Sequence, residues 1–496
     1  MEVKSKSYFF EIWAGVGLIS LVIVWNLPWR FQVNDDEVMM WLVSGAYTGK
    51  PESYAVFIHP ILSWMFSKLY TLAPCVPWYP LSWFFIMYCA FLVFVRLIGK
   101  QNHFGVYRIL WVSFGFALFV HFLFFLQFSF VSAFAVTVGL AYRLSRNKPT
   151  ASLYSIFPED ILILLGFLIR PEILLLFLLG VIGVQGVFFK DFRSVKRIFF
   201  PGLLWILGTG ISWVWIGANG LQEFHEINHL RSQVFDHPSL QLHKDELKST
   251  EPELYHFSNG LINFQLDHNM REKLPQWKEL LDQKRLELFD LEAVFKALST
   301  FILYEHFLLG IFGLFMVFAF LWNPKKAGIY LLVTFGLLIL STPFYLLKVQ
   351  IYVILFLFFF LGMVLNTPRL LPVWSVFWIG IFLLSTAVGF HFYSFFRSSV
   401  NEIPAKKLSE ELDALQGKGQ IYLIGKGAYY RELLFDHPLR FKILGWPTLL
   451  EAEVGTQKVE KNIYLVDSAT YSNNLQYFAP YEKNDSKTSL ILLIQK

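Results

Sequence analysis

The stretch FFEIWAGVGLISLVIVWNLPWRFQVNDDE, residues 9–37, joins an apolar run of membrane-spanning length to three consecutive carboxylates. Charges so close to a bilayer are costly unless they are solvated or paired, so they mark either a surface or a working site. The apolar run ends without a small-residue cleavage site, which predicts a retained first membrane helix rather than a removed signal peptide. Asp35 and Asp36 are therefore predicted to form the first wall of a cavity on the non-cytoplasmic side.

Further apolar runs of similar length follow along the chain. Of its 496 residues, 55% are hydrophobic and 16% are charged, against about 25% charged in average globular domains. The sequence predicts a mainly α-helical polytopic membrane protein with about 11 transmembrane helices. They are expected at about 9–29, 78–95, 107–142 (two short helices with a turn near Gln127), 161–189 (two short helices broken at Arg170), 199–216, 300–322, 327–346, 349–365 and 373–396.

Three regions outside these segments are predicted to be external. The first loop holds two amphipathic stretches, one at the acidic cluster and one of about 13 residues at His59-Pro60, which at about 20 Å is too short to cross and should lie along the interface. Residues 218–298 form a polar, mostly helical insertion in a 1–399 membrane domain. Residues 400–496 are predicted to form a soluble α/β domain with strands at 420–424, 462–466 and 489–494, and helices at 408–415 and 429–435.

The distribution of basic residues predicts which side each region occupies. Basic residues at the chain ends and loops expected inside, such as Arg96, Arg143 and Arg193, far outnumber those in the short loops expected outside. This bias fits the positive-inside rule. The N-terminus is therefore expected in the cytoplasm, and the first loop, the insertion and the C-terminal domain are expected on the external face.

Two interpretations of the acidic cluster stay open. Asn34 followed three residues later by Glu37 has the spacing of a helix N-cap and its capping-box partner, and acidic residues favour a first helical turn. That interpretation leaves Asp35 and Asp36 less explained, beside a hydrophobic surface that carries tryptophan. The alternative is that at least one of these two carboxylates is catalytic or binds substrate.

Arg170-Pro171-Glu172 is the second candidate. About nine apolar residues, roughly 14 Å of helix, separate it from Asp160, so Arg170 is predicted to lie below the outer interface. An arginine at that depth needs a counter-ion, a water-filled cavity or a phosphate. A substrate-binding role for Arg170 and Glu172 and a plain ion pair between them at a proline turn both remain open.

Lys348 and His59 are further substrate-binding candidates, each with a simpler alternative. A lysine at a helix end often reaches lipid headgroups, and His59 precedes Pro60, where a cap residue is expected. In the insertion, two polar groups are predicted to be solvated helix surface because no metal-binding motif accompanies them. They are Asn228, Arg231 and Asp236-His237-Pro238, and Asp267-His268.

Together these features resemble the GT-C superfamily of integral-membrane glycosyltransferases, which includes protein O-mannosyltransferases and aminoarabinose transferases. The matching features are an acidic motif after the first membrane helix, two interfacial helices in the first external loop, short central helices and a soluble tail domain. More specifically, the chain resembles a set of bacterial multi-pass proteins of this kind. The motifs that carry this resemblance are Asn34-Asp35-Asp36, Ser44-Gly45-Ala46-Tyr47-Thr48-Gly49, His59-Pro60 and Arg170-Pro171-Glu172.

The resemblance implies an activity and a location. A multi-pass enzyme of the bacterial inner membrane would transfer a sugar from a polyprenyl phosphate or diphosphate to a glycan, lipid or protein acceptor outside. Asp35 or Asp36 would take the proton from the acceptor hydroxyl, and Arg170, with Lys348 and His59, would stabilise the phosphate leaving group. Metal-dependent relatives place a second acid in the next external loop, but the turn near Gln127 has none, so no metal or other cofactor is predicted.

Two other functions fit the same features. A transporter or flippase of lipid-linked glycans would also use a membrane cavity with an arginine and acids, and a non-catalytic subunit of glycan assembly is a third class. The large external insertion and tail favour the enzyme, because an acceptor needs a docking surface. The aromatic residues are expected to pack or to face lipid, so no nucleic-acid partner is predicted.

Overall fold

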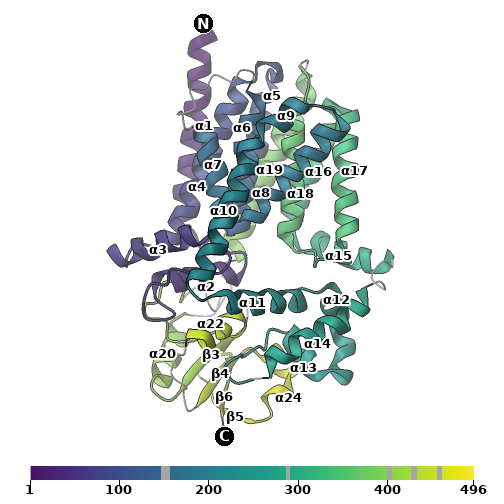
Figure 1. The fold of residues 1–496 in the computed structure, drawn as a ribbon. Helices are drawn as coiled ribbons and strands as arrows, with labels where there is room; N and C mark the ends of the chain where they lie inside the picture. Colours follow the sequence, from purple (N-terminus) through teal and green to yellow (C-terminus); the bar gives the residue numbers. More distant parts are fainter. Residues whose placement is uncertain are drawn as a thin grey trace.

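The structure, a computed structural model, describes residues 2–146, 157–267, 269–285, 291–369, 371, 373–398, 405–425, 433–454, 461–486 and 488–495. A bundle of long helices carries the soluble parts at one end, and the N-terminus lies at the other (Figure 1). The bundle helices are α1 Glu2–Trp25, α4 Trp78–Lys100, α5 Tyr107–Phe124, α6 Phe128–Ser145, α7 Pro158–Ile169, α8 Pro171–Val181 with the π-helical continuation η2 Ile182–Phe188, α9 Phe192–Arg197, α10 Phe199–Ala218, α16 His306–Trp322, α17 Pro324–Ser341, α18 Val349–Asn366 and α19 Trp374–Ser398.

The prediction of a polytopic helical membrane protein is confirmed. In the described ranges, nine helices are long and apolar enough to cross a membrane, or ten if α15 and α16 count as one bent span. The predicted breaks near Gln127 and at Arg170 are both present, between α5 and α6 and between α7 and α8. The predicted number of about 11 included α7 as a membrane-crossing helix. Its 12 residues extend only about 18 Å, which is too short to cross.

One predicted membrane segment begins in a different place. The run expected at 300–322 is two helices, α15 Leu291–Tyr304 and α16 His306–Trp322, bent by 102° at the break between them. Phe295, Ile302 and Leu303 of α15 are exposed, and α15 crosses the foot of the bundle at about the level of α3 (Figure 1). An exposed apolar face on a helix in this orientation is typical of an interfacial helix.

Close packing of α6 against α7 fixes the position of α7 in the bundle. Glycines bring α6 and α7 together, because a Cβ on Gly139 would lie 2.7 Å from Ile163 and one on Gly166 would lie 2.5 Å from Val136. The Ser132 hydroxyl donates to the Gly166 carbonyl oxygen at 2.8 Å. Since α7 is held this closely against the buried helix α6, the residue that follows it, Arg170, has a fixed depth in the bundle.

The first loop contains helix α2 Asn34–Ser44 and helix α3 Pro60–Leu72. The predicted bounds and interfacial setting of α3 agree with the structure, in which Ile61, Trp64 and Leu72 are exposed. The predicted capping box at α2 is wrong. Asn34 is the first helical residue, and Val33, which has no side-chain acceptor, occupies the cap position.

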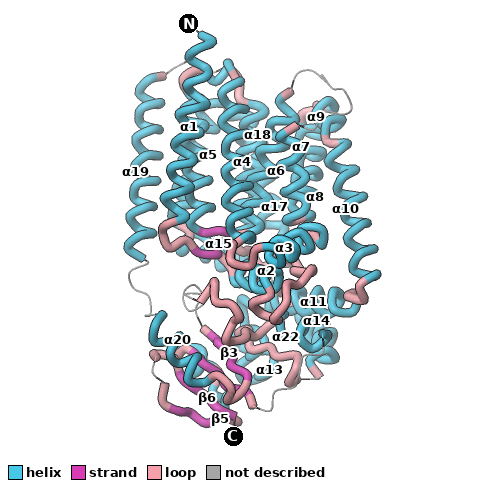
Figure 2. Tube along the Cα trace, turned by 90° about the vertical axis from the view of Figure 1, so that its left-hand side faces the viewer, coloured by secondary structure: helices cyan, strands magenta, loops and turns pink. Residues whose placement is uncertain are grey.

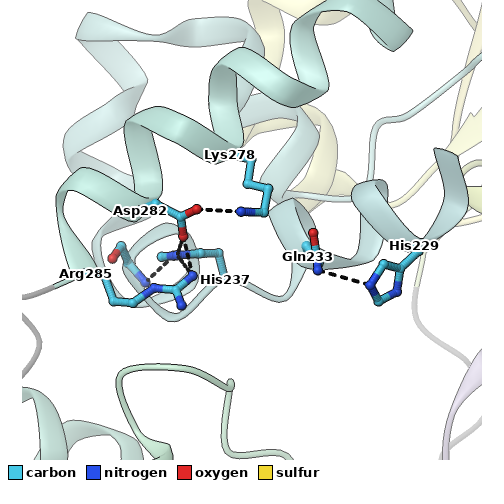
Figure 3. Close-up of polar contacts among 7 residues, drawn as sticks. His229, Gln233, His237, Lys278, Asp282 and Arg285 are labelled. Atoms are coloured by element: carbon cyan, nitrogen blue, oxygen red, sulfur yellow. Dashed lines mark hydrogen bonds and ion pairs between the residues drawn. The ribbon is translucent and has the colours of Figure 1, made fainter. Parts of the chain in front are cut away.

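The insertion and the C-terminal domain lie together below the bundle (Figures 1 and 2). The described part of the insertion contains the helices α11 Gln222–Phe235, α12 Pro238–Thr250, α13 Pro252–Ser258 and α14 Met270–Gln283. Asp282 accepts from Lys278 at 2.5 Å and also pairs with Arg285, and His237 faces it (Figure 3). His237 also caps α12 by accepting from the Ser239 amide, so this group forms caps and ion pairs.

The C-terminal domain contains a four-stranded sheet in the order β3-β4-β6-β5, with β3 and β4 parallel and the other neighbours antiparallel. The predicted strands correspond to β3 Gln420–Ile424, β4 Asn462–Val466 and β6 Ile491–Gln495, while β5 Tyr481–Asn484 was not predicted. Its helices are α20 Ala405–Leu415, α22 Trp446–Val454, α23 Ser468–Asn473 and α24 Leu475–Phe478. Most of the helix predicted at 429–435 lies outside the described residues.

The C-terminal domain packs directly on α2. The Trp41 indole donates to the Leu434 carbonyl oxygen at 2.9 Å, and the Leu439 amide donates to the Ala46 carbonyl oxygen at 2.8 Å. Every residue of α2 from Asp36 to Ser44 is consequently buried. The amphipathic pattern of α2 suggested an interfacial helix, but the domain covers the face that would otherwise meet water.

Candidate functional site

The candidate site begins where the first loop meets the turn between α5 and α6. The short strand β1, Arg30–Phe31, pairs in parallel with β2, Phe125–Leu126. The Gln32 amide then donates to the Leu126 carbonyl oxygen at 2.9 Å. Two segments 95 residues apart in sequence (Arg30 pairs with Phe125) thereby place the acidic cluster against the first turn of α6.

Asp36 is fully buried and engaged in that contact. Its carboxyl group accepts a hydrogen bond from the Tyr79 hydroxyl at 2.9 Å and from the Phe128 amide at 3.2 Å to each oxygen. The Phe128 amide is one of the donors that a helix start leaves without a partner. Asp36 therefore caps α6 from another part of the chain and joins α2, α4 and α6.

Burial raises the pKa of Asp36 to about 8, against the lowering effect of the hydrogen bonds from Tyr79 and Phe128. Between about pH 4 and pH 8 the folded protein therefore holds a proton that the unfolded chain has lost. The free energy of unfolding should fall as the pH rises through this window, because the unfolded state binds fewer protons there.

Asp36→Asn should flatten this pH dependence. An asparagine keeps an oxygen acceptor for Tyr79 and Phe128 and does not titrate, so the melting temperature of the purified variant should fall less than that of wild type between pH 5 and pH 8. Asp245→Asn, at an exposed position, is the matched control and should behave as wild type. An unchanged slope in Asp36→Asn would contradict the assignment.

Asp35 has a different environment from its neighbour. It is half-buried, and its Oδ1 accepts a hydrogen bond at 2.9 Å from the indole nitrogen of Trp446, the first residue of α22. No hydrogen bond to its Oδ2 is recorded from the described residues. Asp35 therefore combines partial exposure with one fixed donor, which orients a carboxylate and leaves an oxygen available.

The charge of Asp35 acts on a buried arginine of the insertion. Burial lowers the pKa of Arg231 from its ordinary value, while the charges of Asp35 and Asp236 oppose that shift. Arg231 donates to the Asn228 side chain at 2.9 Å, and both residues are buried. The prediction that this group is solvated helix surface is wrong, because α11 packs between α14 and α22.

An aromatic row, defined as Phe128, Phe57 and Trp446, joins Asp35 to Arg170. The Phe57 ring lies 6.3 Å from that of Phe128 and 5.3 Å from that of Trp446. The Arg170 guanidinium lies 4.9 Å from the centre of the Phe128 ring. Arg170 and Asp35 thus occupy opposite ends of the row, which places a cation and a carboxylate at the junction of bundle and soluble parts.

The remaining predicted residues have partners inside the protein. Arg170 pairs with Glu172 at 3.5 Å, and the Glu172 side chain is 70% exposed. Lys348 pairs with Asp236 at 2.7 Å. His59 accepts from the Ile61 amide through Nδ1 and contacts the Gly208 carbonyl oxygen through Nε2 at 3.0 Å. His59 is thus a helix cap, which was the simpler alternative for this residue.

Trp446 was not identified from the sequence as a site residue, and Arg231 was assigned to a solvated surface. Trp446 belongs to α22 and Arg231 to α11, both below the bundle. Neither residue belongs to a motif with a fixed sequence spacing from Asp35. A buried charge in a polar segment shows no periodicity that would separate it from its exposed neighbours. Among the described residues, no group of three His, Cys, Asp or Glu side chains could hold a metal ion.

Comparisons with known proteins give structural neighbours but no family. No protein-family model and no curated protein matches the chain. Two solved structures are similar over nearly the whole length. ArnT from Cupriavidus metallidurans bound to undecaprenyl phosphate has a TM-score of 0.41 and 10% identity, covering 97% of each chain. The apo state of the same protein has a TM-score of 0.43 and 10% identity, covering 99% of this chain and 98% of the other.

Proposed function

We propose that this protein is a glycosyltransferase that moves a sugar from a polyprenyl-phosphate-linked donor to an acceptor at the outer face of the membrane. The observation that supports it is the aromatic row with Asp35 at one end and Arg170 at the other. Sugar rings commonly pack on aromatic faces, and phosphates bind arginine. Phe57 is the partly exposed ring of the row, whereas Phe128 and Trp446 are buried. In this proposal the sugar contacts Phe57, between a base and a phosphate-binding group.

In this mechanism, Asp35 takes the proton from an acceptor hydroxyl while the hydroxyl oxygen bonds to the anomeric carbon. The bond between the anomeric carbon and the phosphate oxygen breaks, and the polyprenyl phosphate leaves with that electron pair. Arg170 stabilises the charge that develops on the leaving group. Its pair with Glu172 is long and solvent-exposed, so an incoming phosphate replaces it at little cost.

Asp36 is not the base in this proposal, although the sequence pattern did not separate it from Asp35. It is fully buried, and its raised pKa keeps it mostly protonated at neutral pH. Lys348 acts on the site only indirectly in this proposal. It pairs with Asp236, and the charges of Asp236 and Asp35 both act on Arg231. His59 has the role of a cap.

The direct test is turnover. Purified protein in lipid nanodiscs is incubated with a panel of undecaprenyl-phosphate sugars and hydroxyl acceptors, and transfer is followed by mass spectrometry of the lipid and the acceptor. Transfer from at least one donor is expected. Movement of the lipid-linked sugar across the bilayer without transfer to an acceptor would contradict the glycosyltransferase proposal and indicate a flippase.

Trp446→Phe should lower turnover by about 10- to 100-fold, because a hydrogen bond to a charged group contributes about 1.5–3 kcal/mol. The ring remains, but Asp35 loses the donor that orients it, so kcat should fall while the KM values for donor and acceptor stay close to those of wild type. Trp277→Phe, in the insertion, is the control and should leave kcat and both KM values unchanged. A change confined to KM in Trp446→Phe would argue against positioning by Trp446.

A further inference from the structure

A cavity lies at the opposite end of the bundle from the candidate site. It has a volume of about 600 Å³ and is bounded by α1, α4, α6 and the start of α7. Helix α4 connects the two places, since Tyr79 near its first turn contacts Asp36 and Lys100 at its last turn lines the cavity. Tyr79 and Lys100 are 21 positions apart on this helix, a distance of about 32 Å, so one headgroup cannot occupy both places.

The wall of this cavity is divided between apolar and basic side chains. Phe10, Leu92 and Leu97 contribute apolar surface, and Arg96, Lys100 and Arg146 contribute positive charge. A cavity with both kinds of surface suits an amphiphile better than a fully polar solute.

The basic residues are not equally neutralised. Arg146 pairs with Glu159 at 2.6 Å and lies 3.9 Å above the Phe157 ring, so the acid in the wall is already matched. Lys100 donates to the Tyr142 hydroxyl at 2.6 Å, and no carboxylate of the described residues pairs with it. Arg96 is exposed, and no hydrogen bond or ion pair to it is recorded from the described residues. Two positive charges therefore border the cavity without an acidic partner in the part of the chain that the structure describes.

We propose that this cavity binds the phosphate headgroup of an anionic phospholipid from the leaflet at the N-terminal end of the bundle. Arg96 and Lys100 contact the phosphate, and the Phe10, Leu92 and Leu97 surface contacts the upper part of an acyl chain. Basic pockets between membrane helices bind anionic lipid headgroups in this way. A free phosphate shares the charge but would leave the apolar wall against water, and for that reason the lipid is favoured.

The test uses the full chain, purified in a non-ionic detergent and depleted of lipid. Dioleoylphosphatidylglycerol, dioleoylphosphatidylcholine or sodium phosphate is added at equal phosphate concentration, and the melting temperature is measured. Phosphatidylglycerol should raise it, because a ligand that binds the folded state stabilises that state, and the other two additions should not. An equal rise with phosphatidylcholine would overturn the headgroup assignment, and a rise with sodium phosphate alone would overturn the lipid.

Substitutions test whether phosphatidylglycerol binds in this cavity. Arg96→Gln/Lys100→Gln should lose the stabilisation by phosphatidylglycerol, whereas Arg193→Gln/Lys196→Gln, which removes two exposed charges from α9 at the same end, should keep it. Arg96→Gln alone removes an exposed side chain without a recorded partner and is expected to fold. It should weaken binding of phosphatidylglycerol about fivefold in native mass spectrometry. Unchanged binding in Arg96→Gln and in the double variant would overturn the site.

Discussion

Asp35→Asn is expected to lower turnover by about 10²- to 10⁴-fold, the usual contribution of a positioned general base. Asparagine has nearly the same shape and still accepts the hydrogen bond from Trp446, so the variant should fold as wild type does. It cannot take the proton from the acceptor hydroxyl. The measurement is the rate of transfer at saturating donor and acceptor, with the melting temperature recorded in parallel.

Asp36→Asn is the matched control for this prediction, because it makes the same chemical change one residue away. If Asp36 acts as a neutral cap of α6, its variant should keep turnover within a few-fold of wild type. A large loss in Asp36→Asn with normal turnover in Asp35→Asn would reverse the two assignments. Normal turnover in both would remove these carboxylates from the mechanism.

Arg170→Gln is expected to lower turnover by about 10²- to 10³-fold, as the loss of one group that stabilises developing charge does in other enzymes. Glutamine keeps the length and some hydrogen bonding but has no charge for the leaving phosphate. Arg170→Lys should recover part of the rate, since it restores the charge without the bidentate geometry.

Arg271→Gln is the control for general loss of a positive charge. Arg271 belongs to the insertion and pairs with Glu223 at 2.7 Å on an exposed surface, where such pairs contribute little. It should behave as wild type. If Arg170→Gln changed the KM for the donor and left kcat unaltered, Arg170 would bind the ground state and transition state equally well, and its assigned role would be wrong.

Local sequence signals predicted much of the fold for identifiable reasons. Apolar runs gave the bundle helices, Pro60 gave the start of α3, and Arg170-Pro171 gave the break between α7 and α8, since proline favours the first helical turn. The bend before α16 was missed because the apolar run begins in α15 and continues across it. The α2 capping box was wrong because its start is fixed by the pairing of β1 with β2 and not by a local side-chain cap.

The candidate site was predictable in its acids and its arginine but not in their partners. A carboxylate cluster and an arginine stand out against apolar sequence, because their burial costs are high. The difference between Asp35 and Asp36, one residue apart, depends on what packs around each. Tyr79 and Phe128 surround Asp36, whereas Trp446 contacts Asp35 from more than 400 residues away in sequence.

The sequence by itself determined that this chain is a helical membrane protein with a small α/β domain, because those properties follow from hydrophobic length and periodicity. It also determined which charged side chains stand beside apolar segments. Only the tertiary structure decided that the C-terminal domain covers α2, that Asp36 is buried as a cap, and that an aromatic row separates Asp35 from Arg170. These outcomes depend on contacts between distant segments, which no local pattern encodes.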